Sequence, residues 1–311
     1  MSRVIFVLLP GVHLLDLAGP AQVFTTATEH GLPYEVRYVA QAGRIASAQG
    51  LPLLPDTRWP ELGADDLVIV PGWRAASLRH GPQPDTATRE RLRAHHAAGG
   101  TVASVCSGAD ALGRAGLLDG RRCTTHHDLQ RELAARYPRA RVVRDVLFTT
   151  DDRLVTSAGI ASGIDLALHL VAARHGPAAA ARVARDMVVY TRRNGDEPQA
   201  STMLRHRSHL DDTVHRVQDI IDARLAEPLR LTHLAAGAGV SERTLTRLFH
   251  RATGGLTPLR YQQALRLERA EHLIGHGATV DAAAREVGLN PRMLRRLRSR
   301  GTTVPALAAH H

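Results

Sequence analysis

One cysteine of the chain stands where a strand pattern changes into a helix pattern. In the run Val105-Cys106-Ser107-Gly108-Ala109, β-branched residues precede Cys106 and small residues follow it. Such a turn holds its central side chain at the carboxyl edge of a parallel sheet, in the geometry of a nucleophile elbow. Because the amino terminus of a helix favours negative charge, we expect the helix after Cys106 to stabilise its thiolate.

Nucleophilic chemistry at a cysteine also needs a hydrogen-bond donor for the negative charge that develops on the substrate. Gly72 directly follows the apolar run DLVIVP at 66–71, which is typical of a buried strand. The backbone amide of Gly72 can therefore serve as an oxyanion-type donor near Cys106.

The first 190 residues alternate strand and helix signals. Short β-branched runs predict parallel strands at 4–9, 34–40, 66–71 and 101–106. Helices are predicted at 16–30, 85–98, 107–118, 128–137, 160–174 and 177–189, with a hairpin around Asp151 and Asp152. This order predicts an α/β doubly wound, flavodoxin-like domain with helices on both faces of a mostly parallel sheet.

The segment 231–274 combines an apolar core pattern with an outward polar and basic face. Its apolar residues fall at spacings that line a shared core: Leu231, Leu234, Ala235, Val240, Leu245 and Phe249. Gly239 suits a tight turn of positive φ, and Ser241 suits the N-cap of the next helix. That helix turns outward Glu242, Arg243, Thr246, Arg247 and His250. The pattern predicts a helix-turn-helix whose second helix reads base edges in the DNA major groove.

A second copy of this unit begins 49 residues later. The apolar positions of the first copy are matched there by Val280, Ala283, Ala284, Leu289 and Leu294. Arg298 replaces the core residue Phe249, so it must turn outward or leave its helix poorly packed. We therefore expect the first unit to read bases, and the second unit to contact phosphate through Arg292, Arg295 and Arg296. The alternative for this region is a helical oligomerisation domain.

Positive charge is concentrated in the same region. From Thr213 onward the chain has 15 Arg and eight acidic residues, a net charge of +7, whereas the preceding residues carry only +3 of the total of +10. This asymmetry is the electrostatic pattern expected of a DNA-binding domain.

Composition favours a cytoplasmic protein. No apolar run approaches the roughly 20 residues of a membrane span, and no signal-peptide pattern opens the chain. Two cysteines in 311 residues argue against a disulfide framework and fit a reducing compartment. The 18 histidines show no metal-ligand spacing, so we expect neither a metal nor a cofactor.

The doubled helix-turn-helix resembles the AraC/XylS family from about 213 to 307. The resemblance rests on the patterns A-x-x-x-G-V-S, T-G-x-x-x-P and L-R-L-x-R-A. The first 190 residues resemble the PfpI-type branch of the class I glutamine amidotransferase-like superfamily. That likeness rests on PGVHLLDLAGPAQVF at 10–24, VCSGADALGRAGLLDGRRCTTHH at 105–127 and TSAGIASGIDLALHLV at 156–171. The two halves together are similar to GlxA-type transcriptional regulators.

The second resemblance implies roles for several residues. Asp16 falls where an acidic residue approaches the cysteine in this superfamily. The PfpI proteases have a base His directly after the nucleophile, whereas this chain has Ser107, which argues against amide hydrolysis. Isocyanide hydratases use a comparable set, so Cys106, Asp16 and Ser107 can hydrate a small electrophile or form an inherited pocket that senses a ligand. His126 matches a family histidine, and can be a general base or a strand-end residue bonded to backbone.

Three functions follow from these patterns. The first, which we favour, is a transcriptional regulator that binds double-stranded DNA, senses a small-molecule effector and forms a homodimer. The second is a cysteine-dependent hydratase or amidase with a DNA-binding module, and the third is a redox sensor triggered at Cys106. We expect a sensing domain at 1–190, a linker at 191–212, and an all-α domain with two helix-turn-helix units at 213–311.

Overall fold

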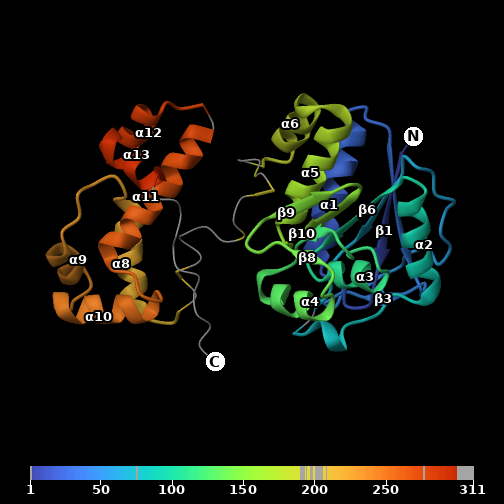
Figure 1. Cartoon of the computed structure of the whole chain (residues 1–311), viewed down its shortest axis with the longest axis horizontal. Helices are drawn as coiled ribbons and strands as arrows, with labels where there is room; N and C mark the ends of the chain where they lie inside the picture. The colour runs from blue at the N-terminus through green and yellow to red at the C-terminus, as the bar shows by residue number, and fades with distance from the viewer. Residues whose placement is uncertain are drawn as a thin grey trace. The chain divides into compact units, whose positions relative to one another are not determined.

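The computed structural model forms two compact units, Met1–Gln199 and Ala200–His311 (Figure 1). It describes residues 2–74, 76–189, 193, 195, 196, 199, 206, 207, 209–275 and 277–299. The boundary between the units falls inside the predicted linker at 191–212, much of which lies outside the described residues. Residues 300–311, the end of the predicted DNA-binding domain, also lie outside them.

The N-terminal unit is built on a six-stranded sheet with the order β2-β1-β5-β6-β10-β9. Five strands run parallel: β1 Ser2–Leu8, β2 Tyr34–Ala40, β5 Leu67–Val70, β6 Thr101–Val105 and β10 Leu154–Ser157. The edge strand β9, Phe148–Asp151, pairs antiparallel with β10 and forms the hairpin predicted at 151–152. Two short ladders join β3 Ile45–Ala46 to β4 Pro52–Leu53 and β7 Arg122–Cys123 to β8 Arg141–Val142.

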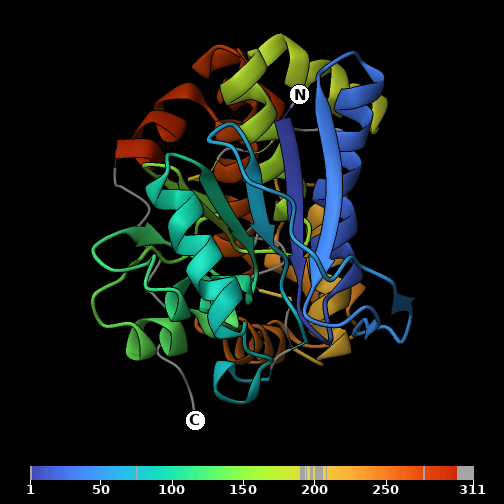
Figure 2. The same cartoon turned by 90° about the vertical axis from the view of Figure 1, so that its right-hand side faces the viewer.

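Helices cover both faces of this sheet (Figure 2). One apolar core contains residues of α1 Leu14–Glu29, α5 Ser162–His175 and α6 Pro177–Asp186. The other contains residues of α2 Thr86–Ala97, α3 Gly108–Arg114 and α4 Gln130–Arg136. Within β1, Val4 and Phe6 enter the first core while Ile5 and Val7 enter the second, because successive strand residues point to opposite faces. Two 3-10 turns, η1 Leu78–His80 and η2 His127–Leu129, complete the unit.

The observed elements confirm the predicted doubly wound fold. The helix after Cys106 is the main difference, because it was expected to reach 118 and α3 ends at Arg114. Gly116 adopts φ 73°, a conformation that ends a right-handed helix. The chain then turns toward β7.

Helices are the regular elements of the C-terminal unit within its described residues. Its elements are α8 Asp212–Ala223, α9 Leu231–Gly237, α10 Glu242–Ala252, α11 Pro258–Gly275, α12 Val280–Glu286 and α13 Pro291–Ser299. Tyr261 and Leu265 of α11 belong to a core with α8, α9 and α10, whereas Ala270 of the same helix belongs to a core with α12 and α13. α11 is therefore the joining helix that the sequence predicted. None of the helices in the described ranges is long and apolar enough to cross a bilayer.

Candidate ligand pocket and nucleic-acid interface

Cys106 occupies a strained turn between β6 and α3. Its φ is 55°, in the left-handed region that a residue with a Cβ rarely adopts. Surrounding bonds hold it there: the Cys106 amide donates to the Ser157 carbonyl at 3.0 Å, and the Thr125 hydroxyl donates to the Cys106 carbonyl at 2.7 Å. The elbow geometry expected from the sequence is therefore present.

Two glycines make room for the elbow. A Cβ at Gly72 would lie 2.4 Å from Asp16 Oδ2 and 2.7 Å from Cys106 Cβ, and a Cβ at Gly159 would lie 2.4 Å from Cys106 Cβ. Neither position can hold a side chain unless Asp16 or Cys106 moves. The structure thus brings Asp16, Gly72, Cys106 and Ser107 together, as predicted. Gly159 was not among the predicted site residues, although it lies in the glycine-rich turn at 156–171.

Asp16 is a buried acid beside the cysteine. Its side chain is fully buried, and burial raises its pKa to about 7 despite the nearness of the Cys106 thiol and the Gly72 backbone amide. The carboxyl faces both groups, but neither of its oxygens makes a hydrogen bond of good geometry within the described part of the chain. A carboxyl in this setting keeps its proton up to neutral pH.

The expectation of a stabilised thiolate at Cys106 is wrong. Burial raises the pKa of the thiol far above its usual range, and the negative charge of Asp16 raises it further. A hydrogen bond from the Ser107 backbone lowers it, but this contribution from the start of α3 is smaller. Cys106 is only 6% exposed, so desolvation outweighs the helix amino terminus.

The Ser107 hydroxyl is engaged with the neighbouring loop. It accepts from the Trp73 amide at 2.8 Å and donates to the Trp73 carbonyl at 3.0 Å. These two bonds fix the loop that follows β5 and so position Gly72. The hydroxyl that the hydratase hypothesis needs for catalysis therefore already has a structural role.

His126 lies at the start of η2, next to Thr125. Burial lowers its pKa, as does the charge of His127, while Asp128 raises it. Its Nδ1 lies 3.6 Å from Asp128 Oδ2, and His127 Nε2 lies 3.4 Å from Asp128 Oδ1. No hydrogen bond joins His126 to the Cys106 thiol among the described residues, so His126 is not a direct base for the cysteine.

Possible metal ligands gather at this same turn. Donor atoms of His126, His127 and Asp128 lie within 4.8 Å of one another. The Asp128 carboxylate is already shared between the two imidazoles, and three donors are fewer than the four of a closed zinc site. Cys123, the other free thiol, is fully buried in the second apolar core, as a packed core residue.

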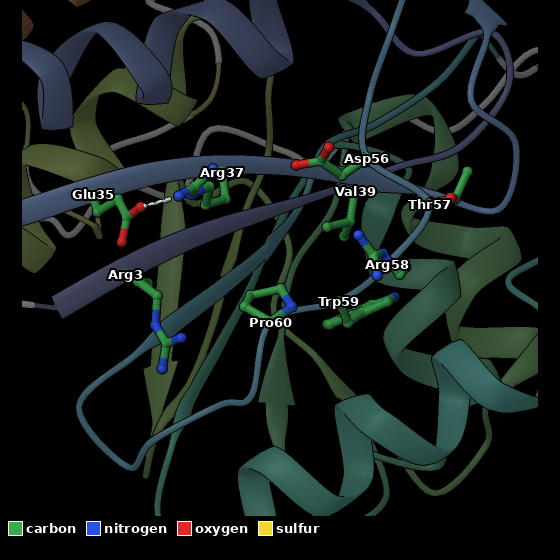
Figure 3. Close-up of a pocket in the computed structure, with 9 residues that line it drawn as sticks. All are labelled: Arg3, Glu35, Arg37, Val39, Asp56, Thr57, Arg58, Trp59 and Pro60. Carbon is green, nitrogen blue, oxygen red and sulfur yellow. Dashed lines mark hydrogen bonds and ion pairs between the residues drawn. The ribbon is translucent and has the colours of Figure 1, made fainter.

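A further hollow of about 440 Å³ opens beside β1 and β2 (Figure 3). It is lined by Arg3, Glu35, Arg37, Val39, Asp56, Thr57, Arg58, Trp59 and Pro60. Arg37 pairs with Glu35, and Arg3 pairs with Asp66. None of the predicted site residues lines this hollow.

The C-terminal unit contains two helix-turn-helix units of matching geometry. Gly239 between α9 and α10 has φ 70°, and its counterpart Gly288 between α12 and α13 has φ 71°. Ser241 caps α10 by accepting from the Thr244 amide at 3.2 Å, and Asn290 accepts from the Met293 amide at 2.7 Å. The turn and cap predicted for the first copy are both present, and the second copy repeats them.

The exposed side of α10 is one continuous surface. A shallow hollow on it is lined by Leu231, Glu242, Arg243, Thr246, Arg247 and His250. The Glu242 carboxylate accepts from the Thr232 hydroxyl at 2.7 Å, and the Thr246 hydroxyl donates to the Glu242 carbonyl at 2.9 Å. Arg243, Arg247 and His250 are exposed, so the basic side chains of this helix reach solvent.

The second unit differs in how its arginines are used. Arg298 turns outward and donates from Nε to Glu271 Oε1 at 2.8 Å, which resolves the packing conflict that the sequence raised. Arg295 pairs with Asp281 of α12. Arg292 and Arg296 are exposed and have no acidic partner among the described residues, so they are the more available of the three predicted phosphate ligands.

Comparison with known proteins separates the same two parts. Residues 2–173 match the DJ-1/PfpI family, and residues 234–306 match a helix-turn-helix domain. The chain belongs to the DJ-1/PfpI family and carries an AraC-type helix-turn-helix domain. It is 31% identical over 278 residues to the HTH-type transcriptional regulator GbdR of Pseudomonas aeruginosa, which covers 86% of this chain and 72% of that protein.

Two other likenesses concern the N-terminal unit. An isonitrile hydratase of Pseudomonas putida is 38% identical over 170 residues, covering 53% of this chain and 68% of that enzyme. The crystal structure of an AraC family transcriptional regulator from Pseudomonas putida superposes with a TM-score of 0.51 at 26% identity. That match covers 60% of this chain and 100% of the solved one. The same fold thus occurs in relatives named as regulators and in one named as an enzyme.

Proposed function

We propose that this protein is a sequence-specific DNA-binding transcriptional regulator, and that its DJ-1/PfpI-type domain binds a small molecule at the Cys106 pocket. The observation that carries the proposal is the exposed face of α10. Arg243, Arg247 and His250 line one surface on a helix that a glycine turn and a serine cap hold in a helix-turn-helix. A helix of this kind fits the major groove, where each base pair displays its own donors and acceptors.

The second helix-turn-helix contributes affinity in this proposal. Arg292 and Arg296 supply positive charge to the phosphate backbone, and such contacts position a protein without reading sequence. A homodimer would place two such domains on a twofold-related site. A protein with this function works where the DNA is, so a cytoplasmic location belongs to the same proposal.

The proposal includes the absence of turnover at Cys106. A nucleophilic thiol must be deprotonated, and the burial that raises the pKa of Cys106 opposes this. The alternative function is hydration of a small electrophile. It is favoured by the close approach of Asp16 to Cys106 and by the likeness to an isonitrile hydratase.

Selection of bound sequences from a random DNA library tests the proposal. The purified full chain should enrich a defined sequence, and Arg243→Ala should lose that preference while retaining the fold. Arg269→Ala is the matched control, because it removes the same charge from an exposed position of α11, outside α10. Failure to enrich any sequence would refute the regulator proposal. Cys106-dependent hydration of an alkyl isocyanide, absent in Cys106→Ala, would put the alternative first.

A further inference from the structure

The chain immediately before the boundary of the two units is hydrogen-bonded to the N-terminal unit, in part at a residue that contacts Cys106. Three residues of the predicted linker, Arg193, Gly195 and Gln199, make hydrogen bonds to the N-terminal unit. The Arg193 guanidinium and amide bond to the buried carboxylate of Asp165. The Gly195 carbonyl accepts from the Leu147 amide at 2.9 Å. The described residues of this segment are therefore held to the N-terminal unit by several hydrogen bonds.

Gln199 makes the most informative of these contacts. Its Nε2 donates to the Thr125 carbonyl at 3.0 Å and to the Val146 carbonyl at 3.1 Å. Its backbone amide donates to Asp145 Oδ1 at 3.1 Å. Thr125 in turn donates its hydroxyl to the Cys106 carbonyl at 2.7 Å. Two hydrogen bonds and one residue therefore separate Gln199 from the strained elbow.

These hydrogen bonds hold the chain at the boundary between the two units. Gln199 is the last residue of the N-terminal unit, and the DNA-binding unit has an anchor of its own close to the boundary. There Arg207 bonds to Asp219 and Asp222 of α8. A change in how Gln199 is held therefore alters the end of the N-terminal unit that leads into the DNA-binding unit.

We propose that Gln199 is a positioning residue that couples the Cys106 pocket to the DNA-binding unit. A ligand that displaces the Thr125–His126 turn moves the Thr125 carbonyl that accepts from Gln199 Nε2. It therefore changes how the last residue of the N-terminal unit is held. This inference rests on the proposed function. It adds that occupancy of the pocket and binding of DNA influence each other through this one side chain.

Gln130 provides a matched control within the same contact. It lies on α4, is buried, and its Nε2 donates to the same Thr125 carbonyl at 3.3 Å. Gln130→Ala removes a bond to this carbonyl without touching the linker, whereas Gln199→Ala removes a bond that the linker itself makes. If the carbonyl merely needs donors to keep the turn in place, the two variants will behave alike. Coupling through the linker requires that they differ.

The test uses iodoacetamide as a probe of Cys106, because the effector is unidentified. Since coupling between two sites is reciprocal, bound DNA must change the state of the pocket. Because the buried Cys106 thiol reacts only from conformations that expose it, its alkylation rate follows the population of those conformations. In the wild-type chain, saturation with the selected DNA should change that population, and with it the rate, about fivefold or more, the low end of ordinary couplings. Gln199→Ala should reduce that change to less than about twofold, and Gln130→Ala should preserve it. The buried thiol of Cys123 serves as the internal reference.

Several outcomes overturn the inference while leaving the regulator proposal intact. One is selective DNA binding with no change of Cys106 reactivity in the wild-type chain, and another is an unchanged response in Gln199→Ala. A second measurement needs no DNA. Alkylation of Cys106 should change hydrogen exchange in peptides covering 193–199 more than in β1, and equal exchange before and after alkylation would refute the coupling. If no DNA sequence is selected, the regulator proposal fails on its own.

Discussion

Replacing Asp16 by asparagine should remove a pH dependence from the stability of the N-terminal unit. The folded-state pKa of Asp16 is about 7, against an ordinary value of 3.8. Below about pH 4 both the folded and unfolded states hold the proton, and the stability gained from protonated Asp16 is fully present. As the pH rises toward 7, the unfolded chain releases this proton while the folded chain keeps it. The stability is therefore lost as the pH rises through the folded-state pKa.

The size of the effect follows from the shift of the pKa. Between the two pKa values the free energy of unfolding falls by about 1.4 kcal/mol per pH unit. From pH 5 to pH 8 the Asp16 contribution to this loss is on the order of 2 to 3 kcal/mol. Because Asp16 is fully buried, solvent screening does not reduce this figure. The asparagine side chain stays neutral throughout, so the variant should lose that much less stability than the wild type over the same interval.

Urea unfolding followed by tryptophan fluorescence measures this difference. The chain has two tryptophans, Trp59 and Trp73, and both lie in the N-terminal unit. Any constant effect of the asparagine amide cancels when the two pH values are compared within each protein. Parallel stability profiles of wild type and Asp16→Asn between pH 5 and 8 would show that Asp16 is ionised at neutral pH, and the reasoning from burial would be wrong.

Asp66→Asn is the control, because Asp66 is a buried acid whose pKa is lowered instead of raised. Burial raises the pKa of Asp66, but hydrogen bonds from the Arg3 and Gly63 amides and the Arg3 side chain outweigh burial and leave the pKa below its ordinary value. The stability from ionised Asp66 is present above the unfolded-state pKa and lost as the pH falls through the folded-state value. Asp66→Asn should therefore destabilise the unit equally at pH 5 and pH 8.

Four further outcomes are expected. Arg243→Ala should weaken binding to the selected DNA by about 1–3 kcal/mol if the arginine contacts a guanine, and an unchanged shift assay would exclude α10 as the reading helix. Arg296→Ala should weaken binding to all sequences alike and lower the salt slope by about one, whereas altered base preference would contradict the phosphate role. Cys106→Ala should leave folding and DNA binding in the absence of ligand intact. A shift assay beside the wild-type chain measures its DNA affinity, and a weaker affinity would contradict this expectation. Gly72→Ala should destabilise the N-terminal unit because its Cβ would lie 2.4 Å from Asp16 Oδ2, and an unchanged urea midpoint would contradict this packing.

Periodicity and turn chemistry were enough to predict the elements that hold both sites. β-branched runs located β5 and β6, which lead to Gly72 and Cys106, and Gly239 with Ser241 located the start of α10. These features depend on local preferences of the backbone, which the order of residues states directly. The premature end of α3 at Arg114 depends on the positive φ of Gly116. That glycine was visible, but a glycine within a helical pattern does not by itself say whether the helix continues.

The contacts that decide the chemistry of the pocket could not be predicted in this way. Gly159 and Thr125 contact the elbow, and Gln199 contacts Thr125. These residues come from three separate segments, and only the folded chain shows that they meet. The partner of Arg298 could not be predicted from the sequence either. Its position in a core pattern indicated a conflict, but the Glu271 carboxylate that receives it belongs to another helix.

The burial of Cys106 explains why a helix that follows a cysteine does not by itself lower the pKa of its thiol. The sequence predicts a thiolate because a helix follows the cysteine. In the structure this helix begins in a buried setting, and the carboxyl of Asp16 lies beside Cys106. Charging Cys106 there requires desolvating a thiolate next to Asp16, whereas the protonated pair places no charge in the buried site. The same enclosure that opposes attack on a substrate holds a strained turn in contact with Thr125. These features support the proposal that the domain senses a ligand beside Cys106 through movement of this strained turn.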